Sequence, residues 1–103
     1  MVDVELNDLR REFLDEARDK VVEMQSALES ASIESLERLT YLAHQLKGSG
    51  GSYGYQRIST DAAALETALE KRTTSNGDAL DAQIQQHVIN LRAEIDRCAR
   101  ELN

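Results

Sequence analysis

The chain has 103 residues, of which 30% are charged and 41% hydrophobic, and its formal net charge is −7. This length fits one domain, residues 1–103, with a modest core. The acidic balance argues against binding to nucleic-acid backbones or anionic membranes. No run approaches the roughly 18 apolar residues of a membrane helix, and the first residues lack a signal peptide's apolar core. The single cysteine, Cys98, excludes an internal disulfide, so a cytoplasmic protein is expected.

Residues 4–29 carry the periodicity of an amphipathic helix. The apolar stripe follows steps of three or four residues and consists of Leu6, Leu9, Phe13, Ala17, Val21, Met24 and Leu28. Leu14 and Val22 sit beside this stripe and are expected to widen it. Ser32 then follows a break in the pattern and is predicted to be the N-cap of the next helix.

A second helix is expected over residues 33–51. Its buried stripe consists of Leu36, Leu39, Ala43, Leu46 and Gly50. Glycine inside a helix costs about 0.5–1 kcal/mol against alanine, so a helix selected for stability alone would avoid Gly48, Gly50 and Gly51. These glycines are expected either to end the helix or to leave room beside the backbone.

A third helix is expected over residues 55–72 and a fourth over residues 78–102, with a polar linker at 73–77 and Asp78 as the N-cap of the fourth. The stripe of the third helix consists of Ile58, Ala62, Leu65 and Leu69. That of the fourth consists of Leu80, Ile84, Val88 or His87, Leu91, Ile95, Cys98 or Ala99, and Leu102. Four amphipathic helices with short links predict an all-α, antiparallel up-down-up-down four-helix bundle.

His44 lies beside the buried stripe of the second helix, and the pattern therefore predicts an exposed imidazole. Lys47 and Gly48 follow on the same face, one turn later. A neutral imidazole is a nucleophile near pH 7, a lysine can balance negative charge, and a glycine leaves room for a partner. These are the requirements for moving a phosphoryl group between proteins. An ordinary surface histidine, a solvated lysine and a helix-packing glycine are the alternative interpretations.

The run His44-Gln45-Leu46-Lys47-Gly48-Ser49, followed by small residues and Tyr53-Gly54, resembles the signature of histidine-containing phosphotransfer (HPt) domains. The resemblance implies a helical bundle that accepts a phosphoryl group on His44, through the ring nitrogen farther from the backbone. Lys47 would stabilise the phosphoryl oxygens and Gly48 would give access. No cofactor is expected on this chain, because a receiver partner would supply the Mg²⁺ ion.

The partners implied are receiver domains of response regulators, a histidine kinase, or both. The docking surface would lie on the second helix and part of the first, with first contacts at Thr40, Tyr41, Gln45, Lys47, Gly48 and Gly51. Docking should be transient, and nothing demands more than a monomer. The resemblance implies a phosphoryl carrier in a two-component phosphorelay. Because the chain has no nucleotide-binding glycine loop, it is not expected to be a complete kinase.

Glu66 has two interpretations. An antiparallel third helix brings residues 62–66 level with His44, so Glu66 could accept a hydrogen bond from the inner ring nitrogen and favour the tautomer with a free outer nitrogen. The resemblance adds that phosphotransfer domains of chemotaxis-type kinases use a glutamate in this way. A solvent-exposed glutamate without this role is the slightly preferred interpretation.

Two alternative functions stay open. The chain could be a phosphotransfer domain excised from a chemotaxis-type histidine kinase, because residues 13–17 and 53–55 resemble that subgroup too. It could also be a helical binding module that carries no phosphoryl group. His87 has no lysine or glycine neighbour of the kind that follows His44 and is predicted to be structural, and the spacing of His44, His87 and Cys98 does not match a zinc site.

Overall fold

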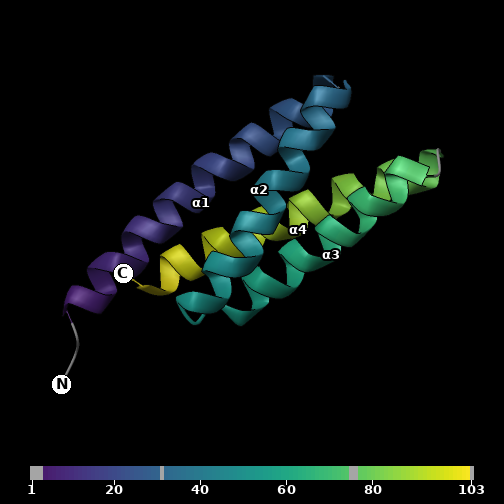
Figure 1. The fold of residues 1–103 in the computed structure, drawn as a ribbon. Helices are drawn as coiled ribbons and strands as arrows, with labels where there is room; N and C mark the ends of the chain where they lie inside the picture. Colours follow the sequence, from purple (N-terminus) through teal and green to yellow (C-terminus); the bar gives the residue numbers. More distant parts are fainter. Residues whose placement is uncertain (1–3, 31, 75–76, 103) are drawn as a thin grey trace.

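A computed structural model describes residues 4–30, 32–74 and 77–102 of the chain. It contains four helices: α1 (Val4–Ser30), α2 (Ile33–Ser52), α3 (Gln56–Thr74) and α4 (Asp78–Leu102). Successive helices run in opposite directions (Figure 1), which confirms the predicted antiparallel four-helix bundle. The helix bounds predicted from the sequence differ from these by no more than two residues.

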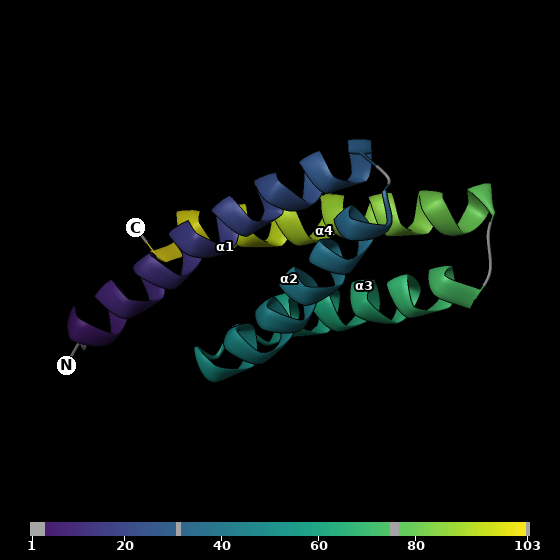
Figure 2. The ribbon, with the colours of Figure 1, turned by 45° about the horizontal axis from the view of Figure 1, so that its top comes forward.

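The helices form a ring in which each one packs against the two that neighbour it, in the order α1, α2, α3, α4. The bundle is elongated, with extents of 51 × 20 × 18 Å. At one end, the last turns of α1 and the first turns of α2 lean away from the end of α3 and the start of α4 (Figures 1 and 2). The start of α1 and the end of α4 lie together at the opposite end.

The predicted apolar stripes meet along the centre of the bundle. Side chains that are at most 2% exposed come from all four helices, among them Val21, Met24, Leu39, Leu46, Ile58, Leu65, Ile84 and Leu91. Burial of this apolar area is the main term that stabilises the fold. Cys98, one of the two alternatives for its position in the stripe of α4, is buried.

The prediction for the buried face of α1, which placed Leu9 in the stripe and Leu14 and Val22 beside it, was partly wrong. Leu9 and Val22 are half exposed, whereas Leu14 is buried. Leu14 lines the α1–α4 boundary together with Ala99 and Leu102, so the buried face of α1 widens toward α4. At 3.6 residues per turn, Val22 lies about 80° farther around the helix from the stripe than Leu14, which turns it toward solvent.

The glycines near the end of α2 do not stop the helix, contrary to one of the two expectations for them. The helix continues through Ser52, and Tyr53 is its C-cap residue. The chain turns at Gly54, whose φ of 83° lies in the left-handed region that glycine adopts without strain. The Tyr53 ring stacks on Phe13 with centroids 4.9 Å apart, which closes this end of the bundle.

Of the two residues predicted as helix N-caps, one is confirmed and the other is not. Ser32 is the N-cap of α2 as predicted, with its hydroxyl oxygen accepting a hydrogen bond from the Ser35 backbone at 3.1 Å. Asp78 is not the N-cap of α4 but its first helical residue, because the carbonyl of Gly77 already accepts the Asp81 backbone N–H at 3.1 Å. The Asp81 carboxylate instead accepts a hydrogen bond from Arg72 of α3.

Candidate functional site

Three side chains predicted as site residues meet on the face between α2 and α3. The Glu66 carboxylate of α3 lies between His44 and Lys47 of α2. One of its oxygens, Oε2, is 2.7 Å from His44 Nδ1, and the other, Oε1, accepts a hydrogen bond from Lys47 Nζ at 2.6 Å. The His44 side chain is 66% exposed, as predicted for a residue beside the buried stripe. One carboxylate therefore holds both residues of the sequence motif.

The contact with Glu66 decides which ring nitrogen of His44 is available. A carboxylate only accepts hydrogen bonds, so Nδ1 carries the proton in this contact. In the neutral imidazole the lone pair then resides on Nε2, the nitrogen farther from the backbone. An exposed ring held in this tautomer presents a nucleophilic nitrogen to solvent or to a docked protein.

The preferred interpretation of Glu66 as a solvent-exposed glutamate was wrong. Its side chain is only 14% exposed, because the antiparallel pairing of α2 and α3 sets it against His44 and Lys47. The hydrogen bond from Lys47 lowers the pKa of the Glu66 carboxyl; burial acts in the opposite direction, and the hydrogen bond from His44 adds to the lowering. Glu66 is therefore an anion at neutral pH.

The glycines of α2 serve two different spatial purposes. A Cβ atom added to Gly48 would meet nothing within 4 Å, so this position is open beside His44 and is not a helix-packing glycine. A Cβ atom on Gly50 would lie 3.1 Å from the backbone nitrogen of Ser59 and 3.2 Å from Cγ2 of Ile58. Gly50 therefore lets α2 and α3 approach closely. Gly51, also proposed as a contact residue, is exposed.

The other residues proposed for docking lie on α2 near His44. Tyr41 is 51% exposed, and its hydroxyl accepts a hydrogen bond from the Gln45 amide at 2.8 Å. The Arg38 guanidinium lies 5.4 Å from the centre of the Tyr41 ring and pairs with Glu23 of α1. Thr40 is half-buried and donates its hydroxyl hydrogen to its own helix. The structure thus places an ordered aromatic ring one turn before His44.

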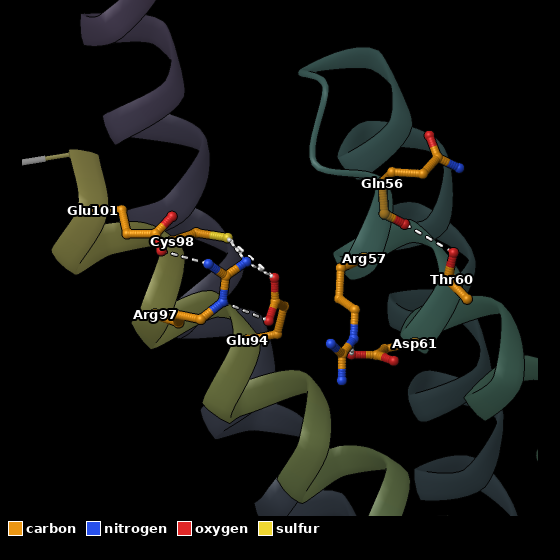
Figure 3. Close-up of polar contacts among 8 residues, drawn as sticks. All are labelled: Gln56, Arg57, Thr60, Asp61, Glu94, Arg97, Cys98 and Glu101. Carbon is orange, nitrogen blue, oxygen red and sulfur yellow. Dashed lines mark hydrogen bonds and ion pairs between the residues drawn. The ribbon is translucent and has the colours of Figure 1, made fainter.

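A second polar cluster, which the sequence analysis did not identify, lies between α3 and α4 (Figure 3). Glu94 is a buried carboxylate at 6% exposure. Arg97 donates two hydrogen bonds to it, one from Nε at 2.9 Å and one from Nη2. Arg97 also pairs with Glu101. Across from it on α3, Arg57 lies 3.8 Å from Asp61. Glu94 lies three residues after the buried Leu91, and this spacing was the signal in the sequence.

The carboxyls of this second cluster differ in their electrostatics. Hydrogen bonding from Arg97 lowers the pKa of Glu94. Burial raises the pKa of Asp61, although Arg57 opposes the shift; its Oδ2 atom is buried and finds no hydrogen-bond partner among the residues that the structure describes. Burial also raises the pKa of the Cys98 thiol, to about 11, so this thiol is protonated at neutral pH. These groups contribute to packing and charge balance between α3 and α4.

Within residues 4–30, 32–74 and 77–102, no group of three or more histidine, cysteine, aspartate or glutamate side chains is arranged to hold a metal ion. None of the helices described combines the length and the apolar character that crossing a membrane requires.

Comparison with protein families identifies one match: the family model of the Hpt domain matches residues 8–100. Neither the curated proteins nor the solved structures that were compared gave a match. The matched residues include all of α2 and α3 and therefore the whole cluster of His44, Lys47 and Glu66.

Proposed function

The chain belongs to the Hpt domain family, whose members serve histidine phosphotransfer in phosphorelays, and we propose that His44 is the residue that carries the phosphoryl group. The observation that carries this proposal is the contact between His44 Nδ1 and Glu66 Oε2 at 2.7 Å. It leaves Nε2 as the free nucleophilic nitrogen of an imidazole that is 66% exposed. His87, the other histidine, is partly buried on α4.

The proposed reaction is a reversible transfer between His44 and an aspartate of a receiver domain. The Nε2 lone pair attacks the phosphorus atom of the aspartyl phosphate, a new P–N bond forms, and the P–O bond to the aspartate breaks. The aspartate leaves as a carboxylate with the bonding electrons, while the Nδ1 proton remains in the hydrogen bond to Glu66. Delivery to a response regulator is the reverse step. The receiver would contribute its Mg²⁺ ion to balance the charge on the transferred group.

The neighbours of His44 have distinct proposed roles. Lys47 donates a hydrogen bond to the same Glu66 carboxylate that contacts His44. Once a phosphoryl group is attached to His44, the Lys47 ammonium group would turn toward the phosphoryl oxygens. Gly48 would let the receiver approach the ring, because a Cβ atom at this position would meet no other part of the described structure within 4 Å. Thr40, Tyr41, Gln45 and Gly51 would form the surrounding docking surface.

The test is phosphoryl transfer from a panel of phosphorylated receiver domains to the wild-type protein, with His44→Gln and His87→Gln as a matched pair. We expect an acid-labile, base-stable label on wild type and on His87→Gln, since a phosphoramidate has this stability, and none on His44→Gln. An equal label on His44→Gln would refute the assignment. If wild type also stays unlabelled by every receiver and kinase tried, a helical binding module becomes the better proposal.

A second candidate function is a phosphotransfer domain of a chemotaxis-type histidine kinase. The contact of Glu66 with His44 Nδ1 favours it, because the resemblance to that subgroup implies a glutamate that accepts a hydrogen bond from the inner ring nitrogen. The isolated catalytic domain of such a kinase, supplied with ATP, should then phosphorylate His44, and Glu66→Ala should abolish that reaction. Efficient labelling by receivers, with none by the kinase domain, would favour the phosphorelay carrier.

A further inference from the structure

Two hydroxyl side chains in the first turns of α3 form hydrogen bonds of different kinds. Thr60 donates to the carbonyl of Gln56 in its own helix at 2.9 Å (Figure 3). Ser59 instead donates across to α2, to the carbonyl oxygen of Lys47 at 2.7 Å. A hydroxyl bond within a helix is the ordinary local alternative for such residues. The bond of Ser59 is therefore a contact between two helices, made at a residue of the phosphotransfer site.

The Ser59 contact lies at a close approach between α2 and α3. The missing side chain of Gly50 permits this approach, since its Cβ would be 3.1 Å from the Ser59 backbone nitrogen. Glu66 follows Ser59 by seven residues, which is two turns or about 10.5 Å along the same face of α3. In an antiparallel pair this places Glu66 beside His44 and Lys47, where it is observed.

Lys47 contacts α3 twice, at Ser59 and at Glu66. Its carbonyl accepts from Ser59, and its ammonium group donates to Glu66. The backbone and the side chain of one residue are thus held at two points along α3. A change in the first contact alters the relative position of α2 and α3, and this position sets the distance between the Glu66 carboxylate and the imidazole.

We infer that Ser59 is a positioning residue for the phosphotransfer site. Its hydroxyl donates a hydrogen bond to the carbonyl of Lys47 and so holds this turn of α2 against α3, next to the close approach at Gly50. This contact keeps the Glu66 carboxylate within hydrogen-bond distance of His44 Nδ1. The inference rests on the proposed function of His44. Ser59 itself has no contact with the reacting nitrogen in this assignment, and it acts through Lys47 and Glu66.

The experiment compares Ser59→Ala with Thr60→Ala, a control that removes a hydroxyl from the adjacent residue without cutting a contact between helices. Two readouts are measured: the ratio of the Nδ1–H to the Nε2–H tautomer of His44, from imidazole ¹⁵N shifts, and the rate of His44 phosphorylation by phosphoramidate. Ser59→Ala is expected to lower both roughly twofold to fivefold, as loss of one hydrogen bond implies. Thr60→Ala should leave both unchanged, and Ser59→Thr, which keeps the hydroxyl, should restore them.

A wild-type tautomer ratio and a wild-type rate in Ser59→Ala, or equal losses in Ser59→Ala and Thr60→Ala, would overturn the inference. If Ser59→Ala does not fold, Ser59→Cys supports the same comparison, because its thiol fills a similar volume and is only a weak donor. Failure of the proposed function looks different: wild type would then resist phosphoramidate and every protein donor, while the tautomer readout would still test the position of Glu66.

Discussion

Gly50 of α2 packs directly on Ser59 of α3, so closely that a Cβ atom on Gly50 would lie 3.1 Å from the Ser59 backbone nitrogen. Two residues earlier, Gly48 faces open space. The same residue type therefore permits close helix packing at one position and leaves access to a histidine at the other. This contrast leads to a prediction that separates stability from function.

Gly48→Ala should raise the free energy of unfolding by about 0.5–1 kcal/mol, because alanine is the better helix former and nothing obstructs its methyl group. It should at the same time slow transfer from a receiver by roughly tenfold, since the methyl group lies where the partner approaches the ring. Urea denaturation and transfer kinetics on the same samples measure the two effects. A stabilised variant with unchanged transfer would show that Gly48 does not provide access.

Gly50→Ala should have the opposite effect on stability. Its methyl group would press on the Ser59 backbone and on Ile58, so a loss of about 1–3 kcal/mol in unfolding free energy is expected. The measurement is the same urea titration. Stability equal to that of Gly48→Ala would contradict the close approach of α2 to α3.

Lys47→Met should raise the pKa of the Glu66 carboxyl, because the hydrogen bond from Lys47 is the largest cause of its lowered value. A carboxyl with a lowered pKa stabilises the fold above its unfolded-state pKa and loses that contribution as the pH falls through the folded-state value. The variant should therefore lose more stability at pH 7 than at acid pH. Titration of the Glu66 ¹³C carboxyl signal measures the pKa directly, and an unchanged value would contradict the pairing.

Glu94→Gln should lower the free energy of unfolding by about 1–2 kcal/mol at pH 7, because Arg97 loses its buried charged acceptor. The pKa of Glu94 is lowered, so the difference from wild type should be complete at neutral pH and should fade below about pH 4. Glu101→Gln is the matched control, since Glu101 is the exposed acceptor of the same guanidinium and its loss should matter little. Equal effects of the two variants would refute the importance of burial.

Asp61→Asn should stabilise the protein at neutral pH, by up to about 1 kcal/mol, because it removes the charge of a carboxylate whose buried Oδ2 atom has no hydrogen-bond partner within residues 4–30, 32–74 and 77–102. Burial raises the pKa of Asp61, so the ionised form opposes folding above that pKa and the neutral form does not. The gain should vanish as the pH falls below the unfolded-state pKa. Thermal unfolding at pH 7 and pH 3 measures this, and a destabilised variant at pH 7 would show that the Arg57 pair outweighs burial.

Residues with a clear local signal were predicted correctly. The apolar stripe that includes Leu39, Ala43 and Leu46 placed His44 on an exposed face, and the cap at Ser32 followed from its side chain and its position. The N-cap of α4 was misplaced by one residue, because the first intrahelical hydrogen bond already runs to the carbonyl of Gly77, a residue without a side chain that could signal a cap. Val22 was misplaced because a position beside a stripe does not say how far the neighbouring helix extends.

The sequence by itself determined the four helices, the bundle and the motif around His44, because helical periodicity and the spacing of His44, Lys47 and Gly48 are properties of one helix. Only the tertiary structure decided that Glu66 holds His44 and Lys47, that Gly50 and not Gly48 packs on α3, and that Glu94 is buried. These are contacts between helices. They depend on the relative rotation and position of two helices, which the packing of the whole core sets and no single stretch of sequence specifies.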